Sequence, residues 1–253
     1  MEYRRIINGL EVRAEYSEKS VEKLFLPLLR NLTELYQSKN RRITVLLAAP
    51  PAAGKSTLAS FLQYLSETTE GLEPVTAIGM DGFHHYQDFL LSHTVIQNGE
   101  EIPMVKVKGA PITFDREKLE ERLAEVSSGM ECFWPDYDRT KHNPVDGVRT
   151  VTGNIIMLEG NYLLLDEPGW RKLRNYSDFN IFILADEENV RQRLIDRKAA
   201  SVSYEEAVLH VESSDLPNVR ECLTFSSGAD IILRLLPDGE YIFESGHFPL
   251  VEE

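Results

Sequence analysis

Cysteine is scarce in this chain, which has two among its 253 residues, Cys132 and Cys222. They are far apart and neither forms a C-x-x-C pair, so no pattern for a metal site or a disulfide framework is present. Basic residues are also few, 27 against 41 acidic ones, which gives a net charge of −14. Because a nucleic-acid-binding surface needs a basic face, this balance argues against nucleic acid as a partner.

Long apolar segments are absent as well. No stretch approaches the length that a membrane-spanning helix needs. The first residues, MEYRRIINGLEVRAEY, are charged and lack the apolar core of a signal peptide. We therefore expect a cytoplasmic protein with no membrane contact. Hydrophobic residues make up 42% and charged residues 27% of the chain, so a sizeable core can form without disulfides or metals.

The pattern of apolar residues predicts alternating strands and helices. Such alternation indicates an α/β fold, with a mostly parallel sheet that has helices on both faces. The predicted strands are at 43–49, 74–80, 153–160, 178–185 and 230–236, and the predicted helices at 20–38, 57–66, 116–127 and 187–199.

The ends of the chain suggest additions to this core. An N-terminal hairpin is predicted at 3–16, with Asn8-Gly9 as its turn, and Pro27 either kinks the following helix or marks a late start. We expect residues 1–40 to pack on a domain of residues 41–253, forming one structural unit. The hairpin and the C-terminal PDGEYIFESGHF each suit a homodimer contact or a cover over a sheet edge.

The stretch LLAAPPAAGKSTLASFL (46–62) holds most of a phosphate-binding loop. The usual pattern is G-x-x-x-x-G-K-[ST], and the segment follows a buried strand and opens a helix, as such a loop must. Ala49 replaces the first glycine, and we expect it to constrain the entry to the loop, because an alanine at positive φ is costly. Lys55 can reach the β- and γ-phosphates and Ser56 can ligate Mg²⁺. The predicted donors to phosphate are the N–H groups of Ala53, Gly54, Lys55, Ser56 and Thr57.

Two acidic residues directly follow predicted strands, Asp81 in AIGMDGFHHY and Glu159 in IIMLEGNY. Ligands bind at the carboxyl ends of strands in an open parallel sheet, so both carboxylates should face the loop. One carboxylate can accept the proton of a substrate hydroxyl while another holds Mg²⁺. Ser56 and Glu159, with Asp81 beside them, form the predicted Mg²⁺ site. The alternative is that Asp81 caps a turn and Glu159 lies at the surface.

The segment DEENVRQRLIDRK (186–198) places Arg193 and Arg197 four residues apart on one helix face. Arginines there can neutralise the charge on a phosphoryl group in transfer. The alternative is that they pair with acidic residues on a solvated helix.

With these motifs in place, the sequence resembles the uridine kinase, pantothenate kinase and phosphoribulokinase group of P-loop kinases. Within this group it is most similar to a bacterial subgroup described as nucleoside/nucleotide kinase-like or fructose-transport-system kinase-like. The resemblance runs from about residue 4 to 235 and is carried by NGLEVRAEY, FLPLL, AAGKSTLA, MDGFHH, KGAPITFD, PDYDR, LEGNYLLLDEPGW and SSDLPN. It implies a P-loop fold with a helical lid and a kinase that uses ATP and Mg²⁺.

The resemblance also implies roles for individual residues. Asp81 is similar to the catalytic acid–base residue, Glu159 to the Mg²⁺-associated carboxylate, and Arg193 and Arg197 to lid arginines. Asn218, in DLPN, resembles a position near the nucleotide base. Substrate positions are implied for His84, Lys108, Asp115, Tyr137 and His142. Asp115 suits a helix N-cap equally well, and His142 also fits a solvated loop histidine.

The sequence therefore predicts a phosphotransferase with a small-molecule alcohol as acceptor. A nucleoside or related compound is the leading acceptor class, with pantothenate or a fructose-like sugar as alternatives. An alternative of another class is a regulatory nucleotide-binding NTPase without an acceptor, although Asp81 has no evident use in such a protein. A nucleic-acid-dependent ATPase conflicts with the acidic composition.

Overall fold

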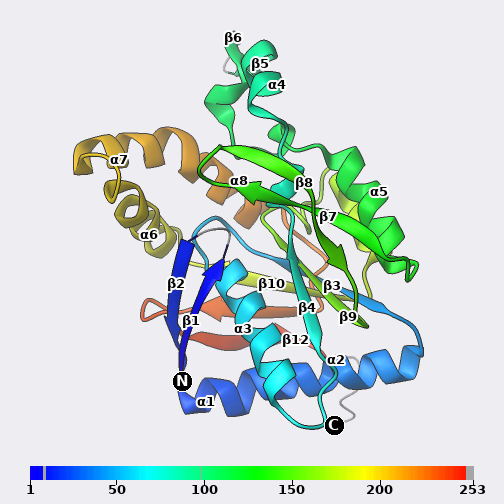
Figure 1. Ribbon diagram of the computed structural model, residues 1–253. Helices are drawn as coiled ribbons and strands as arrows, with labels where there is room; N and C mark the ends of the chain where they lie inside the picture. Colours follow the sequence, from blue (N-terminus) through cyan, green and yellow to red (C-terminus); the bar gives the residue numbers. More distant parts are fainter. Residues whose placement is uncertain (8–9, 98, 249–253) are drawn as a thin grey trace.

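A computed structural model describes residues 1–7, 10–97 and 99–248, and its centre is a six-stranded sheet (Figure 1). Five neighbouring strands are parallel, as predicted, and the sixth pairs antiparallel with the strand beside it. Across the sheet the order is β12 (Tyr241–Gly246), β11 (Ile231–Leu235), β10 (Phe179–Ala185), β3 (Ile43–Ala48), β9 (Ile155–Gly160) and β4 (Val75–Gly79).

Helices cover both faces of this sheet. All residues of β3 and β9 are buried, as continuous apolar runs of central parallel strands require. Alternate residues of β3 belong to two separate core clusters, since successive side chains point to opposite faces. One cluster contains α2 (Leu26–Lys39), α3 (Lys55–Thr68) and α6 (Glu187–Ala199), and the other contains α5 (Arg116–Ser127) and the 3₁₀ helix Trp170–Tyr176.

The N-terminal hairpin prediction is confirmed by β1 (Glu2–Ile7) and β2 (Leu10–Glu15), while the predicted turn at Asn8-Gly9 lies outside the described residues. The hairpin forms its own two-stranded sheet and packs on α3. The ring of Tyr3 is 5.3 Å from that of Phe61, and the ring of Tyr16 is 4.5 Å from it.

The following helix begins earlier than the proline suggested. It runs through α1 (Glu18–Ser20), a π-helical turn η1 (Val21–Phe25) and α2. Helical backbone thus precedes Pro27, while the long α-helix itself begins at Leu26, one residue before the proline. Pro27 occupies the first turn of α2, directly after the π-helical turn, where its missing N–H costs little.

Residues 84–112, where the sequence shows no clear periodic pattern, contain several short elements. These are α4 (Gln87–Ser92), β5 (Thr94–Gln97), β6 (Glu100–Pro103), η3 (Met104–Val107) and η4 (Pro111–Thr113). The β5–β6 hairpin and α4 project from the top of the molecule in Figure 1. Most β5 and β6 side chains are exposed, so the hydrophobic pattern gave little signal for these strands.

A second group of elements was not predicted from the sequence. The antiparallel ribbon of β7 (Cys132–Asp138) and β8 (Asn143–Val151) contains Pro135 and Pro144, which weaken a strand pattern. Beyond α6, the chain forms α7 (Tyr204–His210), the π-helical turn η6 (Val211–Asp215) and α8 (Leu216–Phe225).

The two edges of the sheet are formed by β12 and β4. β12, from the C-terminal segment that suited a sheet-edge cover, pairs with β11. On the opposite edge, side chains bond to the free backbone groups of β4. Trp134 donates to the Gly79 carbonyl at 2.8 Å, Arg149 donates to the Ala77 carbonyl at 2.7 Å, and Gln63 accepts from the Ala77 N–H at 3.0 Å. Within the described residues, no helix has the length and apolarity needed to cross a membrane.

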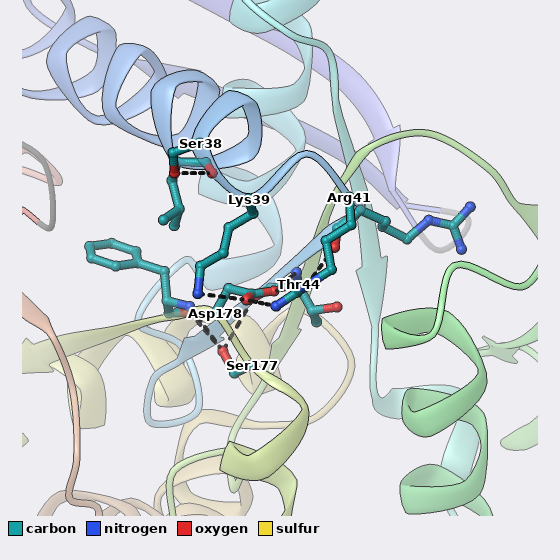
Figure 2. A network of polar contacts seen from close by, with 9 residues as sticks. Ser38, Lys39, Arg41, Thr44, Ser177 and Asp178 are labelled. Carbon is teal, nitrogen blue, oxygen red and sulfur yellow. Dashed lines mark hydrogen bonds and ion pairs between the residues drawn. The ribbon is translucent and has the colours of Figure 1, made fainter.

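A charge cluster ties the amino ends of two strands to the helix before them (Figure 2). The Asp178 carboxylate, before β10, accepts from the guanidinium of Arg41 and from the backbone N–H of Thr44, and it lies 3.7 Å from the Lys39 ammonium. The Asp178 N–H in turn donates to the Thr44 carbonyl at 2.8 Å. This cluster, called the Asp178 cluster below, fixes the end of the sheet farthest from the phosphate loop.

Candidate active site

The phosphate loop joins β3 to α3 and follows the predicted strand–loop–helix order. Positive φ values occur at Ala52, 62°, and at Gly54, 80°, but not at Ala49. The expectation that Ala49 strains the loop is therefore wrong, because the strain falls three residues later. Lys55 begins α3, with Ser56 and Thr57 in the same first turn, so their N–H groups are free of helical partners.

A tyrosine from the far edge of the sheet supports this loop. The buried Tyr241 hydroxyl, on β12, donates to the Ala53 carbonyl at 2.8 Å. A Cβ on Gly54 would lie 2.5 Å from the same hydroxyl oxygen. Glycine at 54 therefore has two physical causes, the positive φ and the close approach of Tyr241. The sequence analysis did not identify Tyr241, since nothing near it in sequence belongs to the loop.

Ser56 and Glu159 are in direct contact. The Ser56 hydroxyl donates to Glu159 Oε1 at 2.8 Å, and Glu159 is buried at the end of β9. Burial raises the pKa of Glu159 to about 7, and the negative charge of Asp81 adds to this, against the opposing effect of Lys55. A hydroxyl and an under-compensated carboxylate are oxygen ligands that suit Mg²⁺, which leaves its other positions to water and nucleotide phosphates. The residues present therefore fit this cation.

Asp81 begins the 3₁₀ turn η2 (Asp81–Phe83), directly beyond β4. Gly82 allows this turn to pack on β7, because a Cβ there would lie 2.4 Å from the Pro135 carbonyl oxygen. Burial acts to raise the pKa of Asp81, but nearby positive charges outweigh it and hold the pKa below its usual value. The groups that favour its charged form are His84, Lys55, Arg139 and Arg197. A carboxylate kept ionised beside one whose pKa is raised can accept a proton.

Arg139 is a site residue that the sequence analysis missed. Its guanidinium lies 3.4 Å from Asp81 Oδ2, and it comes from the turn between β7 and β8. The arginine belongs to PDYDR, one of the motifs that carry the family resemblance, which was the available signal. Its role could not be assigned because the β7–β8 ribbon, which brings it to Asp81, was not predicted.

Four of the predicted substrate residues line one hollow of about 390 Å³ beside Asp81, called the acceptor hollow below. Three of these side chains, those of His84, Tyr137 and Lys108, lie close to one another on its wall. The His84 ring is 5.1 Å from that of Tyr137, and the Lys108 ammonium is 5.6 Å from the Tyr137 ring centre. The residues that line it are Asp81, His84, Val105, Lys106, Lys108, Gly109, Tyr137, Arg139, His142, His210, Ser214 and Asp215.

Asp115 and Asn218 are placed differently from this group. Asp115 accepts from the Lys118 N–H at 3.1 Å as the N-cap of α5, and it borders a separate depression together with His85. The buried Asn218 amide donates to the Ser214 carbonyl at 3.1 Å and faces Gly109. The binding roles of both residues stay predictions.

The two predicted lid arginines on α6, Arg193 and Arg197, face different parts of the site. The charge of Arg197 acts on Asp81 and on Asp215, and burial lowers the pKa of Arg197. Arg193 lies beside Gly239, and its charge partly opposes the burial that raises the pKa of Tyr241, the residue that supports the phosphate loop. On this helix face, one arginine is therefore near Asp81 and the other is near the residue that supports the phosphate loop.

Relatives of this chain include named kinases. The Escherichia coli (strain K12) "Uncharacterized protein YggC" is 40% identical over 241 residues, which cover 94% of this chain and 98% of that protein. The Schizosaccharomyces pombe "Putative uridine kinase C227.14" is 30% identical over 203 residues, which cover 78% of this chain and 84% of that protein. A pantothenate kinase of Lactococcus lactis subsp. cremoris matches at 26% identity and 63% coverage of its own length. No model of a protein family matches the chain.

A solved structure shares the fold. The crystal structure of a "putative fructose transport system kinase" from Silicibacter sp. TM1040 has a TM-score of 0.73 and 28% sequence identity, and covers 82% of this chain and 98% of its own. The strand order, the phosphate loop and these relatives agree in one conclusion. The chain belongs to the uridine kinase, pantothenate kinase and phosphoribulokinase group of P-loop kinases.

Proposed function

We propose that this protein uses Mg²⁺–ATP to phosphorylate a hydroxyl group of a small metabolite. The observation that supports this most directly is the meeting of three groups at the carboxyl edge of the sheet. These are the phosphate loop, the Ser56–Glu159 pair and the ionised Asp81, which borders the acceptor hollow. Candidate acceptors are a nucleoside or related compound, pantothenate, and a fructose-like sugar.

Each side chain has a defined part in this reaction. The loop N–H groups and Lys55 hold the phosphates, and Ser56 with Glu159 would hold Mg²⁺, which supplies charge neutralisation on the phosphate oxygens. Asp81 accepts the hydroxyl proton of the acceptor or aligns that hydroxyl for in-line attack. Arg139 keeps Asp81 ionised and oriented through the ion pair at 3.4 Å. Arg193 and Arg197 offset negative charge as α6 and the helices after it close the site.

The alternative of another class, a regulatory nucleotide-binding protein without an acceptor, leaves the acceptor hollow without a purpose. The hollow opens beside Asp81, and lysine, histidine and arginine side chains line it. A nucleotide switch needs no base at that position. The kinase is therefore the better supported proposal.

The test is ADP release from Mg²⁺–ATP in the presence of single candidate acceptors, with Lys55→Ala and Asp81→Asn proteins assayed beside the wild type. We expect one acceptor to stimulate release, and Asp81→Asn to lower kcat by about 10²- to 10⁴-fold. Asp146→Asn is the matched control, because Asp146 binds Tyr86 and Lys118 away from the acceptor hollow. An Asp81→Asn protein with near-normal turnover would contradict the role given to Asp81.

A further inference from the structure

The acceptor hollow contains cations that have no acidic partner. In a chain with 41 acidic and 27 basic residues, a lysine beside a cavity would be expected to meet a carboxylate. Among the described residues, however, neither Lys106 nor Lys108 lies within ion-pair distance of one. The two acidic residues that border the hollow, Asp81 and Asp215, already have basic partners of their own. Asp81 pairs with Arg139 at 3.4 Å, and Asp215 lies 3.9 Å from His210.

Lys108 is the more informative of the two lysines because it is partly buried. Its ammonium donates to Gln87 Oε1 at 2.7 Å and to the His142 carbonyl at 2.8 Å, both neutral groups. An ammonium has three N–H donors, so one remains after these two bonds. Burial lowers the pKa of Lys108, since no nearby anion offsets the loss of water. A half-buried cation held by neutral groups is destabilised until an anion arrives.

The position of Lys108 relative to Asp81 connects this charge to the reaction. Both residues line the acceptor hollow, and Tyr137 on its wall is close to His84 and to the Lys108 ammonium. Lys106 and His142 border the same hollow, with His142 following Lys141 in the β7–β8 turn. A molecule whose hydroxyl reached Asp81 would therefore extend along Tyr137 toward the cations.

We propose that the acceptor alcohol carries a second, anionic group, a carboxylate or a phosphate, which is bound by Lys108. This inference rests on the proposed kinase function, and it selects among the candidate acceptors by charge. It favours an acid or a phosphorylated sugar or nucleoside over the corresponding neutral alcohol. The same ammonium also ties α4 to the β7–β8 turn, so anion binding and the shape of the hollow depend on one side chain.

The experiment compares ADP release with matched pairs of acceptors, one member of which carries an anionic group that the other lacks. The pairs are pantothenate with pantetheine, fructose 6-phosphate with fructose, and uridine 5′-monophosphate with uridine, so the carboxylate and phosphate arms are separate. We expect only the charged member of one pair to be an efficient acceptor. Lys108→Gln should raise its KM by about 10- to 100-fold while kcat falls less, because a charge-assisted bond is lost.

Two further variants separate charge recognition from a structural role. Lys108→Arg keeps the charge and should hold the KM of the anionic acceptor within a few-fold of wild type. Lys141→Gln removes an equal charge from an exposed lysine that does not line the acceptor hollow, and it should leave this KM unchanged. If Lys108 only supported the shape of the hollow, Lys108→Gln would raise the KM of charged and neutral acceptors by the same factor.

Each outcome decides the question. A neutral member that works as well as its charged partner overturns the anion proposal while the kinase function stands. If no compound stimulates ADP release, the Mg²⁺–ADP-loaded protein is titrated calorimetrically with the three charged compounds. Binding that disappears in Lys108→Gln but persists in Lys141→Gln supports the anion site, even though the kinase test has failed. No Lys108-dependent binding overturns the proposal.

Discussion

Buried carboxylates lie at both ends of the central sheet, and the two differ in how completely their charge is compensated. The Asp178 side chain is 6% exposed, although the residue as a whole is half-buried, and Glu159 is buried, with 7% of the residue exposed. Asp178 meets an arginine, a lysine and a backbone N–H, whereas Glu159 has one hydroxyl donor and a pKa raised to about 7. A compensated charge holds structure together, and an under-compensated one marks a place for a ligand.

The same distinction applies to the bases. Arg41 and Arg174 pair with carboxylates away from the site, while Lys108 in the acceptor hollow has neutral partners. The site thus holds an acid, Glu159, and a base, Lys108, whose hydrogen-bond partners among the described residues are all neutral. The predictions below test whether unpaired charge, rather than burial, separates the functional residues from the structural ones.

Among these predictions, the largest effect is expected at Arg139, the partner of Asp81. Arg139→Ala should lower kcat by about 10²- to 10³-fold, because the charge that orients and ionises the base is lost. The free energy of unfolding should change by less than about 1 kcal/mol, since the pair is partly exposed. Steady-state kinetics and urea unfolding measure the two quantities. Arg122→Ala, which breaks an exposed pair on α5, is the control and should leave both unchanged.

The next effect is on stability at the opposite end of the sheet. Asp178→Ala should lower the free energy of unfolding by about 2–3 kcal/mol, because two cations and a backbone N–H lose their acceptor. The KM for ATP should not change. Urea unfolding provides the measurement, and Asp166→Ala, at a more exposed pair, serves as the control with an expected loss of under about 1 kcal/mol. Equal losses of unfolding free energy in the two variants would mean that the Asp178 cluster stabilises the fold no more than an exposed ion pair does.

Glu159→Gln should change the free energy of unfolding in the opposite direction from Asp178→Ala. The folded pKa of about 7 lies above the ordinary 4.5, so between these values the folded protein holds a proton that the unfolded chain has released. Stability without Mg²⁺ must therefore fall as pH rises from about 4.5 to about 7. Glu159→Gln should remove this contribution to the slope and stabilise the protein by about 1–3 kcal/mol at pH 8.

Unfolding in urea at several pH values with EDTA present measures this difference from the wild type. Glu34→Gln, at an exposed position on α2, is the control and should follow the wild-type curve. A Glu159→Gln protein that is less stable at pH 8 would mean that the carboxylate is already compensated in the ligand-free protein.

The smallest effect is expected at Tyr241. Tyr241→Phe should lower the free energy of unfolding by about 1 kcal/mol, because the Ala53 carbonyl loses its donor. The KM for ATP should rise a few-fold while the KM for the acceptor stays constant, since Tyr241 contacts only the loop side of the site. Tyr176→Phe, whose hydroxyl contacts Glu120, is the control. An unchanged KM for ATP would show that the loop holds its shape without Tyr241.

The sequence by itself determined the parts of this protein that are contiguous in the chain. The buried run of β3, the phosphate loop and the start of α3 follow one another, so local rules identify the fold and place Lys55 and Ser56. Asp81 and Glu159 were found because each directly ends a predicted strand, and parallel strands end at the same edge of a sheet.

Only the tertiary structure decided which distant segments meet around Asp81. Arg139 lies in the turn of the β7–β8 ribbon, Tyr241 on the edge strand β12, and Lys108 in the turn between η3 and η4. None of these segments has a strong periodic pattern. Asp115, which the sequence allowed as a substrate residue or a helix cap, caps α5 and borders a different depression. The physical reason is that the charge on a side chain is compensated or not by its neighbours in space, and the sequence fixes those neighbours only through the completed fold.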